Sequence, residues 1–308
     1  MKFPKGLALG LLGILLFLSL AVFGLVLTLN QTILNPDFMV SQINKLDISS
    51  LAGEFFGEFL SEQIPGGQTP EGKALMAEVI DDTLADLEPW IKDQMGTVIY
   101  SGYNYLLGES QSLNLVISTD QLKETLKDNI KPALIRAIPI DELASLPPAM
   151  IDTASDEYYQ EFSAQIPSTI DISEEMLGPE VISTLEQVRE YVSYIQIAYK
   201  ALIGFMLLLI GLIVLIHRQV RDSTRQIGIT FLVYGIPGYV GVFFIKNFAM
   251  GYLTQLTGQL GLPASLQAWL PQLVNDILTP MQMFSLGILI GGVVLLVVSF
   301  VHKREPAY

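Results

Sequence analysis

Residues 7–29 read LALGLLGILLFLSLAVFGLVLTL, a run without a single charged side chain. About 20 consecutive apolar residues span the hydrocarbon core of a bilayer as a helix. Three more apolar runs follow at 201–216, 227–245 and 283–301. Because backbone polar groups in lipid must be hydrogen-bonded within the segment, each run is expected to be helical. The sequence therefore predicts an all-α integral membrane protein built on a four-transmembrane-helix bundle.

Basic residues lie at one set of ends of these runs. Four spans place the N-terminal stub, the segment after the second span and the C-terminal tail on one side of the membrane. Those segments contain only two acidic residues, Asp222 and Glu305. Their basic residues are Lys2, Lys5, Arg218, Arg221, Arg225, Lys303 and Arg304. Since Lys and Arg concentrate in cytoplasmic segments, we expect a multi-pass plasma-membrane protein whose termini are both cytoplasmic.

This topology divides the chain into a definite order of segments. The first apolar run is interpreted as a retained anchor, because it is longer than the apolar part of a usual signal peptide and no small-x-small cleavage site follows. The expected segments are a stub and first span at 1–29, an extracytoplasmic domain at 30–195, spans at 196–217, 227–249 and 281–302, a basic cytoplasmic loop at 218–226, a second extracytoplasmic loop at 250–280, and a cytoplasmic tail at 303–308.

The large domain at 30–195 carries most of the negative charge. It contains eight Lys or Arg and 28 Asp or Glu, a net charge of −20, whereas the whole chain has −14. Nucleic acid is therefore disfavoured as a partner, because phosphate binding requires a basic surface. The chain has no cysteine, which excludes disulfides, thiolate nucleophiles and cysteine-bound metals. The domain must be held together by its own apolar core.

Hydrophobic periodicity predicts that this domain is mainly helical. Apolar residues recur at three- and four-residue steps over 71–106, 122–138 and 179–216. Pro89 interrupts the first stretch and is expected to break or kink it. The segment 63–70 contains two prolines and two glycines and is expected to be a loop.

A short pattern, an apolar residue followed by any residue, Ile and Ser, precedes several of these helices. It occurs at 46–49, 115–118 and 170–173. We interpret each copy as an extended stub whose Ser or Asp caps the next helix. Ser118 and Gln121 fit a capping box. Because Leu113, Leu115 and Ile117 recur at every second position, as on one face of a strand, two such stubs are candidates to pair as a short β-ribbon.

Three acidic ladders with four-residue spacing are the candidate functional faces of the domain. The members of the ladder at 120, 124 and 128 alternate with lysines and form a neutralised face. The other two ladders have no interleaved bases. They are Glu54, Glu58 and Glu62, and then Glu78, Asp82 and Asp86. Like charges at this spacing repel weakly on a helix. A solvated face is the preferred interpretation, with a protein partner or a divalent cation as the alternatives.

The residues that most enzymes use are scarce in this chain. The two histidines, His217 and His302, fall at the cytoplasmic membrane boundary, so Ser-His and Cys-His nucleophiles are excluded from the large domain. No phosphate-binding loop, dinucleotide fingerprint or HExxH motif is present. We expect no catalytic residue, no cofactor and no dedicated metal site. A pair of exterior carboxylates is the one enzymatic alternative.

Small residues mark the expected helix contacts within the membrane. Gly235, Pro237 and Gly238 should kink the third span near its middle. Gly287 and Gly291 form a GxxxG pair in the fourth span. Such glycines allow helices to approach closely. Packing within the bundle is the preferred interpretation, and contact between copies in a homo-oligomer is the alternative.

The second loop, 250–280, has no Lys or Arg and one acid, Asp276. Pro271 is expected to divide it into short apolar helices. These helices would either lie in the membrane interface or cap the large domain, and the second arrangement is preferred.

The layout of one span, a large loop, two spans, a small loop and a last span is similar to that of tetraspanins and claudins. The cysteine motifs of both families are absent, so no residue role is transferred. The expected function is an envelope interaction or assembly component whose acidic domain faces a protein partner. The alternative is a transport or lipid-handling protein that uses the kinked third span and the 250–280 loop. That alternative requires a continuous polar cavity, with Gln226, Tyr234, Tyr239 and Asn247 as candidate lining residues.

Overall fold

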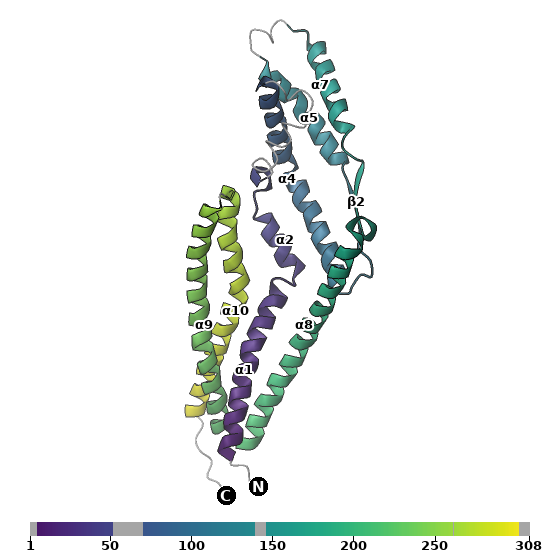
Figure 1. Ribbon diagram of the computed structural model, residues 1–308. Coiled ribbons are helices and arrows are strands. Elements are labelled where there is room, and N and C mark those ends of the chain that lie inside the picture. The colour runs from purple at the N-terminus through teal and green to yellow at the C-terminus, as the bar shows by residue number, and fades with distance from the viewer. Residues whose placement is uncertain (1–4, 52–69, 139–145, 261, 302–308) are drawn as a thin grey trace. The chain divides into compact units, whose positions relative to one another are not determined.

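The structure is a computed structural model that describes residues 5–51, 70–138, 146–260 and 262–301 (Figure 1). The chain forms two compact units. The described residues of the membrane unit are 5–39, 187–260 and 270–301, and those of the second unit are 40–51, 70–138, 146–186 and 262–269. In chain order, the elements are α1 (Lys5–Gln31), α2 (Pro36–Asn44), α4 (Pro70–Leu106), β1 (Asn114–Ser118), α5 (Asp120–Ala137), α7 (Pro148–Ser163), β2 (Thr169–Ser173), α8 (Glu174–His217), α9 (Val220–Gln259) and α10 (Ala264–Val301).

Four helices, α1, α8, α9 and α10, are each long and apolar enough to cross a membrane. The protein is thus a mainly helical membrane protein, as the four apolar runs predicted. Two local expectations were wrong. Residues 220–226 belong to α9, so the turn before this helix is much shorter than the predicted basic loop. Most of 250–280 lies within α9 and α10 instead of forming separate short helices.

Both expectations were wrong because basic residues and prolines were interpreted as helix ends, and here they are not. The basic residues after 217 mark the expected edge of the bilayer, while the helix continues past it. Pro271 and Pro280 lie inside α10. A proline removes one backbone hydrogen bond, and long helical segments on either side, packed against neighbours, can tolerate this loss.

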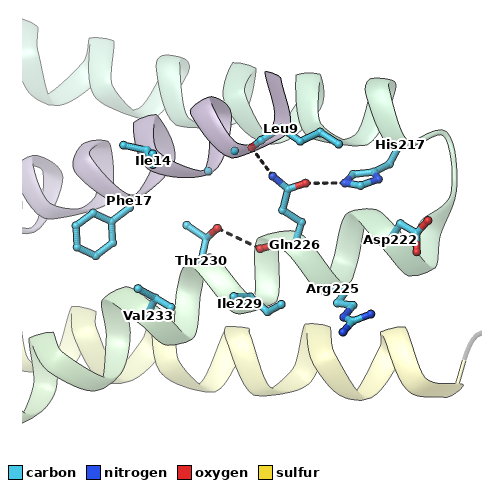
Figure 2. A pocket seen from close by; sticks show the side chains of 12 residues that line it. Leu9, Ile14, Phe17, His217, Asp222, Arg225, Gln226, Ile229, Thr230 and Val233 are labelled. Atoms are coloured by element: carbon cyan, nitrogen blue, oxygen red, sulfur yellow. Dashed lines mark hydrogen bonds between the residues drawn. The ribbon is translucent and has the colours of Figure 1, made fainter. Parts of the chain in front are cut away.

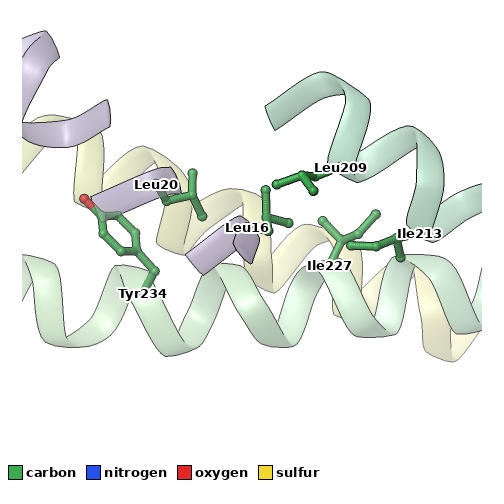
Figure 3. Packing of buried hydrophobic residues seen from close by; sticks show 6 residues of the cluster. All are labelled: Leu16, Leu20, Leu209, Ile213, Ile227 and Tyr234. Atoms are coloured by element: carbon green, nitrogen blue, oxygen red, sulfur yellow. The ribbon is translucent and has the colours of Figure 1, made fainter. Parts of the chain in front are cut away.

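The core of the membrane unit brings together residues of α1, α8 and α9 (Figure 3). Leu16, Leu209 and Ile213 are at most 2% exposed. Phe284 and Ile288 of α10 pack against the same cluster. Since lipid is as apolar as these side chains, close packing instead of solvent exclusion holds such a bundle together.

The second unit is built around contacts of α4 with α5 and of α5 with α7. Its core contains Val79 of α4 and Ile130, Ala133 and Leu134 of α5, all buried. Aromatic side chains of α7 cover this cluster, because one face of α7 carries Tyr158, Tyr159 and Phe162 at helical spacing. The predicted helices over 71–106 and 122–138 are confirmed, and α4 continues through Pro89.

The predicted β-ribbon is present. Strands β1 and β2 pair antiparallel, with Leu115 opposite Ile172 and Ile117 opposite Ile170. The expected capping box is not formed: Thr119 is the N-cap of α5 and makes no side-chain capping bond. The Ser118 hydroxyl instead accepts a hydrogen bond from the backbone N–H of Asp120 at 3.2 Å.

The 46–49 copy of the pattern does cap a helix, through its aspartate. Asp47 Oδ1 accepts the backbone N–H of Ser50 at 3.0 Å, and residues 48–51 are helical. Further along the chain, Trp269 Nε1 donates to the Gln42 carbonyl at 3.0 Å, and both residues belong to the second unit. Residues 264–269 at the start of α10 thus belong to the second unit.

Candidate functional site

The ladder of Glu78, Asp82 and Asp86 on α4 is not a bare acidic face, contrary to the sequence prediction. The guanidinium of Arg136 forms ion pairs with both Glu78 and Asp82. Asn129 donates to Asp86 Oδ2 at 3.0 Å. Both partners come from α5, which packs along α4. Helical spacing within α4 could not reveal them, because they are supplied by tertiary contact. This ladder therefore stabilises the unit and is withdrawn as a candidate partner face.

The other two ladders have different outcomes. Glu54, Glu58 and Glu62 lie outside the described residues. The acidic residues of α5 at 120, 124 and 128 are exposed, but the neighbouring lysines are used elsewhere. Lys131 pairs with Asp152 of α7 at 2.5 Å, and the Lys127 ammonium lies over the Tyr159 ring. Within the described ranges, no group of three or more His, Asp or Glu residues could hold a metal ion.

A small polar cluster joins α4 to the segment after α2. Glu88 accepts a hydrogen bond from Ser49 at 2.8 Å and pairs with Lys92 at 2.6 Å, and Lys92 also reaches the Asn44 carbonyl. Burial alone would raise the pKa of Glu88, but the bonds from Lys92 and Ser49 outweigh burial and lower it. The pKa of Asp47 is also lowered, chiefly by the backbone N–H and the hydroxyl of Ser50. The internal hydrogen bonds of this cluster indicate a structural role.

The carboxylates of α7 form a different kind of surface. Asp156, Glu157 and Glu161 are exposed and point away from the side that carries Tyr158, Tyr159 and Phe162. Asp152 is also exposed, but it lies next to Tyr159 on the helix and pairs with Lys131 of α5. We call Asp156, Glu157 and Glu161 the α7 acidic face. From 146 to 186 the chain contains nine Asp or Glu and no Lys or Arg. Met150, which is 59% exposed, falls on the same side of α7 by helical spacing.

Sequence reasoning missed this face because the search concentrated on uniform four-residue ladders. Asp156, Glu157 and Glu161 do not form one line with uniform four-residue spacing. The signal that could have found it is the complete absence of basic residues over 146–186. Figure 1 shows α7 as a separate helical element of the second unit.

The membrane unit contains a cavity of about 620 Å³ between α1 and α9, beside the last residue of α8. Figure 2 shows Gln226 at its polar end. Gln226 Nε2 donates to the Leu9 carbonyl at 2.6 Å, and its Oε1 lies 2.6 Å from His217 Nε2. Since the amide nitrogen is already the donor to Leu9, Oε1 must accept, so His217 Nε2 carries a proton. The sequence placed His217 only at the expected membrane boundary. In the structure, His217 also connects α8 to α9 and, through Gln226, to α1.

The other polar residues proposed to line a transport path lie elsewhere. The cavity lining extends from the end of α8 to Phe17 and Val233. Tyr234 is buried, and its ring makes edge contacts with Phe17 and Phe284. Asn247 bonds to the Phe243 carbonyl of its own helix. Neither these residues nor Tyr239 line this cavity.

The glycines predicted to lie at helix contacts fall into two groups: at some an added Cβ would clash with the neighbouring helix, and at others it would not. A Cβ at Gly235 would lie 2.7 Å from the backbone nitrogen of Leu289, and one at Gly238 would lie 2.8 Å from Ser285 Oγ. At Gly287 a Cβ would meet nothing within 4 Å, and at Gly291 it would make only ordinary contact with Phe231. The close α9–α10 contact therefore uses Gly235 and Gly238, and α9 continues through Pro237.

Three of the basic residues that determined the predicted topology, Arg218, Arg221 and Arg225, lie around the turn between α8 and α9. Arg218 has φ of 56° and its N–H bonds to the Val214 carbonyl, a left-handed residue that ends α8. Arg221 and Arg225 lie on the first turns of α9, and Lys5 begins α1. Lys2, Lys303 and Arg304 lie outside the described residues.

Comparisons of the chain with protein-family models, with curated proteins and with solved structures found no match.

Proposed function

We propose that this chain is a non-enzymatic interaction or assembly component of the cell envelope. The four apolar helices anchor it in the plasma membrane, and the α7 acidic face of the extracytoplasmic second unit binds a protein partner. The observation that carries this proposal is the distribution of ion pairs. Glu78 and Asp82 of α4 pair with Arg136 of α5, and Asp152 of α7 pairs with Lys131, whereas Asp156, Glu157 and Glu161 of α7 are exposed in a stretch of 41 residues, 146–186, that has no basic residue.

The chemistry of this face indicates the kind of partner. Three exposed carboxylates favour a basic surface, and charge complementarity mainly raises the rate and specificity of association. Such a contact should weaken as salt rises, because exposed charges are screened. Met150 adds a flexible apolar side chain to the face. The partner is therefore expected to present Lys or Arg together with an apolar anchor.

The membrane unit supports the role of an anchor. Intramembrane ionisable groups usually mark ion or substrate paths. The cavity at Gln226 is lined as far as Phe17 and Val233, and beyond them the rings of Phe17, Tyr234 and Phe284 pack together. The transport alternative requires a polar path that continues past these rings, so the geometry favours the interaction role.

The test is affinity purification of the tagged full-length chain from membranes in mild detergent, after crosslinking in intact cells. The variant Asp156→Asn/Glu157→Gln/Glu161→Gln removes three charges from the α7 acidic face. The control, Glu175→Gln/Glu180→Gln/Glu186→Gln, removes three exposed charges from α8. We expect a protein that copurifies with the wild type and the control and is lost from the α7 variant. Identical copurifying proteins in all three samples would reject the α7 face as the binding surface.

A further inference from the structure

The cavity of the membrane unit exists because α1 has glycines where it faces α9. A Cβ at Gly10 would meet nothing within 4 Å. A Cβ at Gly13 would make only ordinary contacts, at 3.6 Å, with Gln226 Nε2 and Thr230 Oγ1. Both glycines line the cavity. The missing side chains leave a space that neighbouring groups do not fill.

The lining changes from polar to apolar along α9. Asp222, Arg225 and Gln226 line one end, and Ile229 and Val233 line the other. Figure 2 shows them in this order along the helix. At 1.5 Å per residue, roughly 12 Å of helix separates Arg225 from Val233. A ligand that matches this lining has a charged group at one end and an extended apolar chain at the other.

The polar end is held in place by Gln226. Its side chain is bonded both to the Leu9 carbonyl of α1 and to His217 at the end of α8. Thr230 bonds to the Gln226 carbonyl at 3.1 Å. The amide thus links α1, α8 and α9 at the polar end of the cavity.

The charge at this end favours an anion. Arg225 is exposed and lines the cavity, and Arg218 and Arg221 belong to the same short segment, where Asp222 is the one acid. By the distribution of Lys and Arg, this end lies at the cytoplasmic headgroup level and Val233 lies deeper in the bilayer. Basic groups at that level attract anionic headgroups.

We propose that this cavity is a binding site for one anionic phospholipid of the surrounding bilayer. Its phosphate lies near Arg225, and an acyl chain runs between α1 and α9 past Ile229 towards Phe17 and Val233. The occupant fills the space opposite Gly10 and holds α1 against α9 at their cytoplasmic ends. This site is independent of the partner face on α7.

The test uses the full-length chain, purified in mild detergent and stripped of lipid. Binding of phosphatidylglycerol is measured by native mass spectrometry, with phosphatidylcholine and soluble glycerol phosphate as comparison ligands. Gly10→Leu places a side chain in the cavity where no atom obstructs it, and Gly204→Leu is the matched control, because a Cβ there also meets nothing. Arg225→Gln removes the cation, and Arg221→Gln removes a cation outside the lining.

We expect a one-to-one phosphatidylglycerol adduct in the wild type, Gly204→Leu and Arg221→Gln. Gly10→Leu should abolish it, and Arg225→Gln should weaken binding about fivefold. An unchanged adduct in Gly10→Leu would overturn the proposal. Equal binding of phosphatidylcholine would reject the anionic headgroup. Displacement of the lipid by an equal concentration of glycerol phosphate would assign the site to a soluble phosphate compound.

Discussion

The guanidinium of Arg136 in α5 forms an ion pair with Glu78 in α4, 58 residues earlier in the chain. A second nitrogen of the same group pairs with Asp82, one turn further along α4. One cation thus separates two carboxylates that would otherwise repel each other. Arg136→Gln should lower the thermal stability of the second unit. Because all three side chains are well exposed, the decrease should be small and should shrink further at high salt.

A variant that lacks both carboxylates shows whether the effect of Arg136→Gln comes from these ion pairs. In the background Glu78→Gln/Asp82→Asn, the further change Arg136→Gln should cost less stability than it does in the wild type. Lys123→Gln removes a charge from the same helix and serves as the control. Equal effects of Arg136→Gln in both backgrounds would mean that the ion pairs do not contribute to stability.

Ile130 lies at the centre of the second unit and is 1% exposed, next to Val79 and Ala133. Ile130→Ala should lower the free energy of unfolding of this unit by about 2–5 kcal/mol, because it removes apolar contacts and leaves a cavity. Ile135 on the same helix is 37% exposed, so Ile135→Ala should cost clearly less. Hydrogen exchange of the α5 and α7 amides in the full-length protein measures both. Similar losses would contradict the assignment of this core.

The elements that the sequence predicted well are those with local signals. The recurring stubs at 115–118 and 170–173 were among the candidates for a ribbon, and they pair with Ile117 opposite Ile170. Periodicity predicted α4 and α5. The bonds of Arg136 could not be predicted, because they depend on how α5 packs against α4. The length of α9 was missed because the arginines from 218 to 225 indicated a loop as well as the expected bilayer edge, whereas the helix begins at Val220.

The candidate site residues divide in the same way, into those with a local sequence signal and those that depend on tertiary packing. Residue types alone predicted the four helices that are long and apolar enough to cross a membrane. They could not separate Gly235, which contacts Leu289, from Gly287, which has open space around it, because both are glycines in apolar runs. The link from His217 to Leu9 through Gln226 joins residues more than 200 positions apart and carries no local pattern.

Gly235 is where α9 and α10 approach most closely among the glycine contacts described. Gly235→Ala should destabilise the membrane unit by about 1–3 kcal/mol, because the new Cβ would overlap the Leu289 backbone and force the helices apart. Gly287→Leu should leave this stability unchanged. Thermal unfolding in detergent measures both changes. Light scattering on Gly287→Leu also tests the oligomer alternative, because a contact between copies through the GxxxG face should then be lost.

Asp47 provides a test based on pH. Its hydrogen bonds to Ser50 and Ser49 favour the charged form, so the pKa of Asp47 is lower in the folded protein than in the unfolded chain. Its contribution is therefore fully present above the unfolded pKa and is lost as the pH falls through the folded pKa. Asp47→Ala should destabilise the local helix by about 1 kcal/mol at neutral pH, as is typical for loss of an N-cap.

The exchange protection of the Ser50 amide, corrected for the intrinsic rate at each pH, reports this bond directly. Protection should fall below the pH range in which an ordinary aspartate titrates. Asp47→Asn keeps an acceptor oxygen and should keep most of the protection without the pH dependence. A wild-type profile that matches the Asn variant would show that the charge of Asp47 is not involved.

The absence of cysteine from the chain allows a direct test of the predicted orientation, since any introduced thiol is the one thiol in the protein. Gln160→Cys places it on the exposed side of α7, and Val220→Cys places it at the exposed start of α9. A membrane-impermeant maleimide should label Gln160→Cys in intact cells and Val220→Cys only after permeabilisation, because the arginine-rich segment is expected to be cytoplasmic. The reverse pattern would place α7 inside the cell. The α7 acidic face would then face a cytoplasmic partner, and Arg225 would lie at the outer headgroup level.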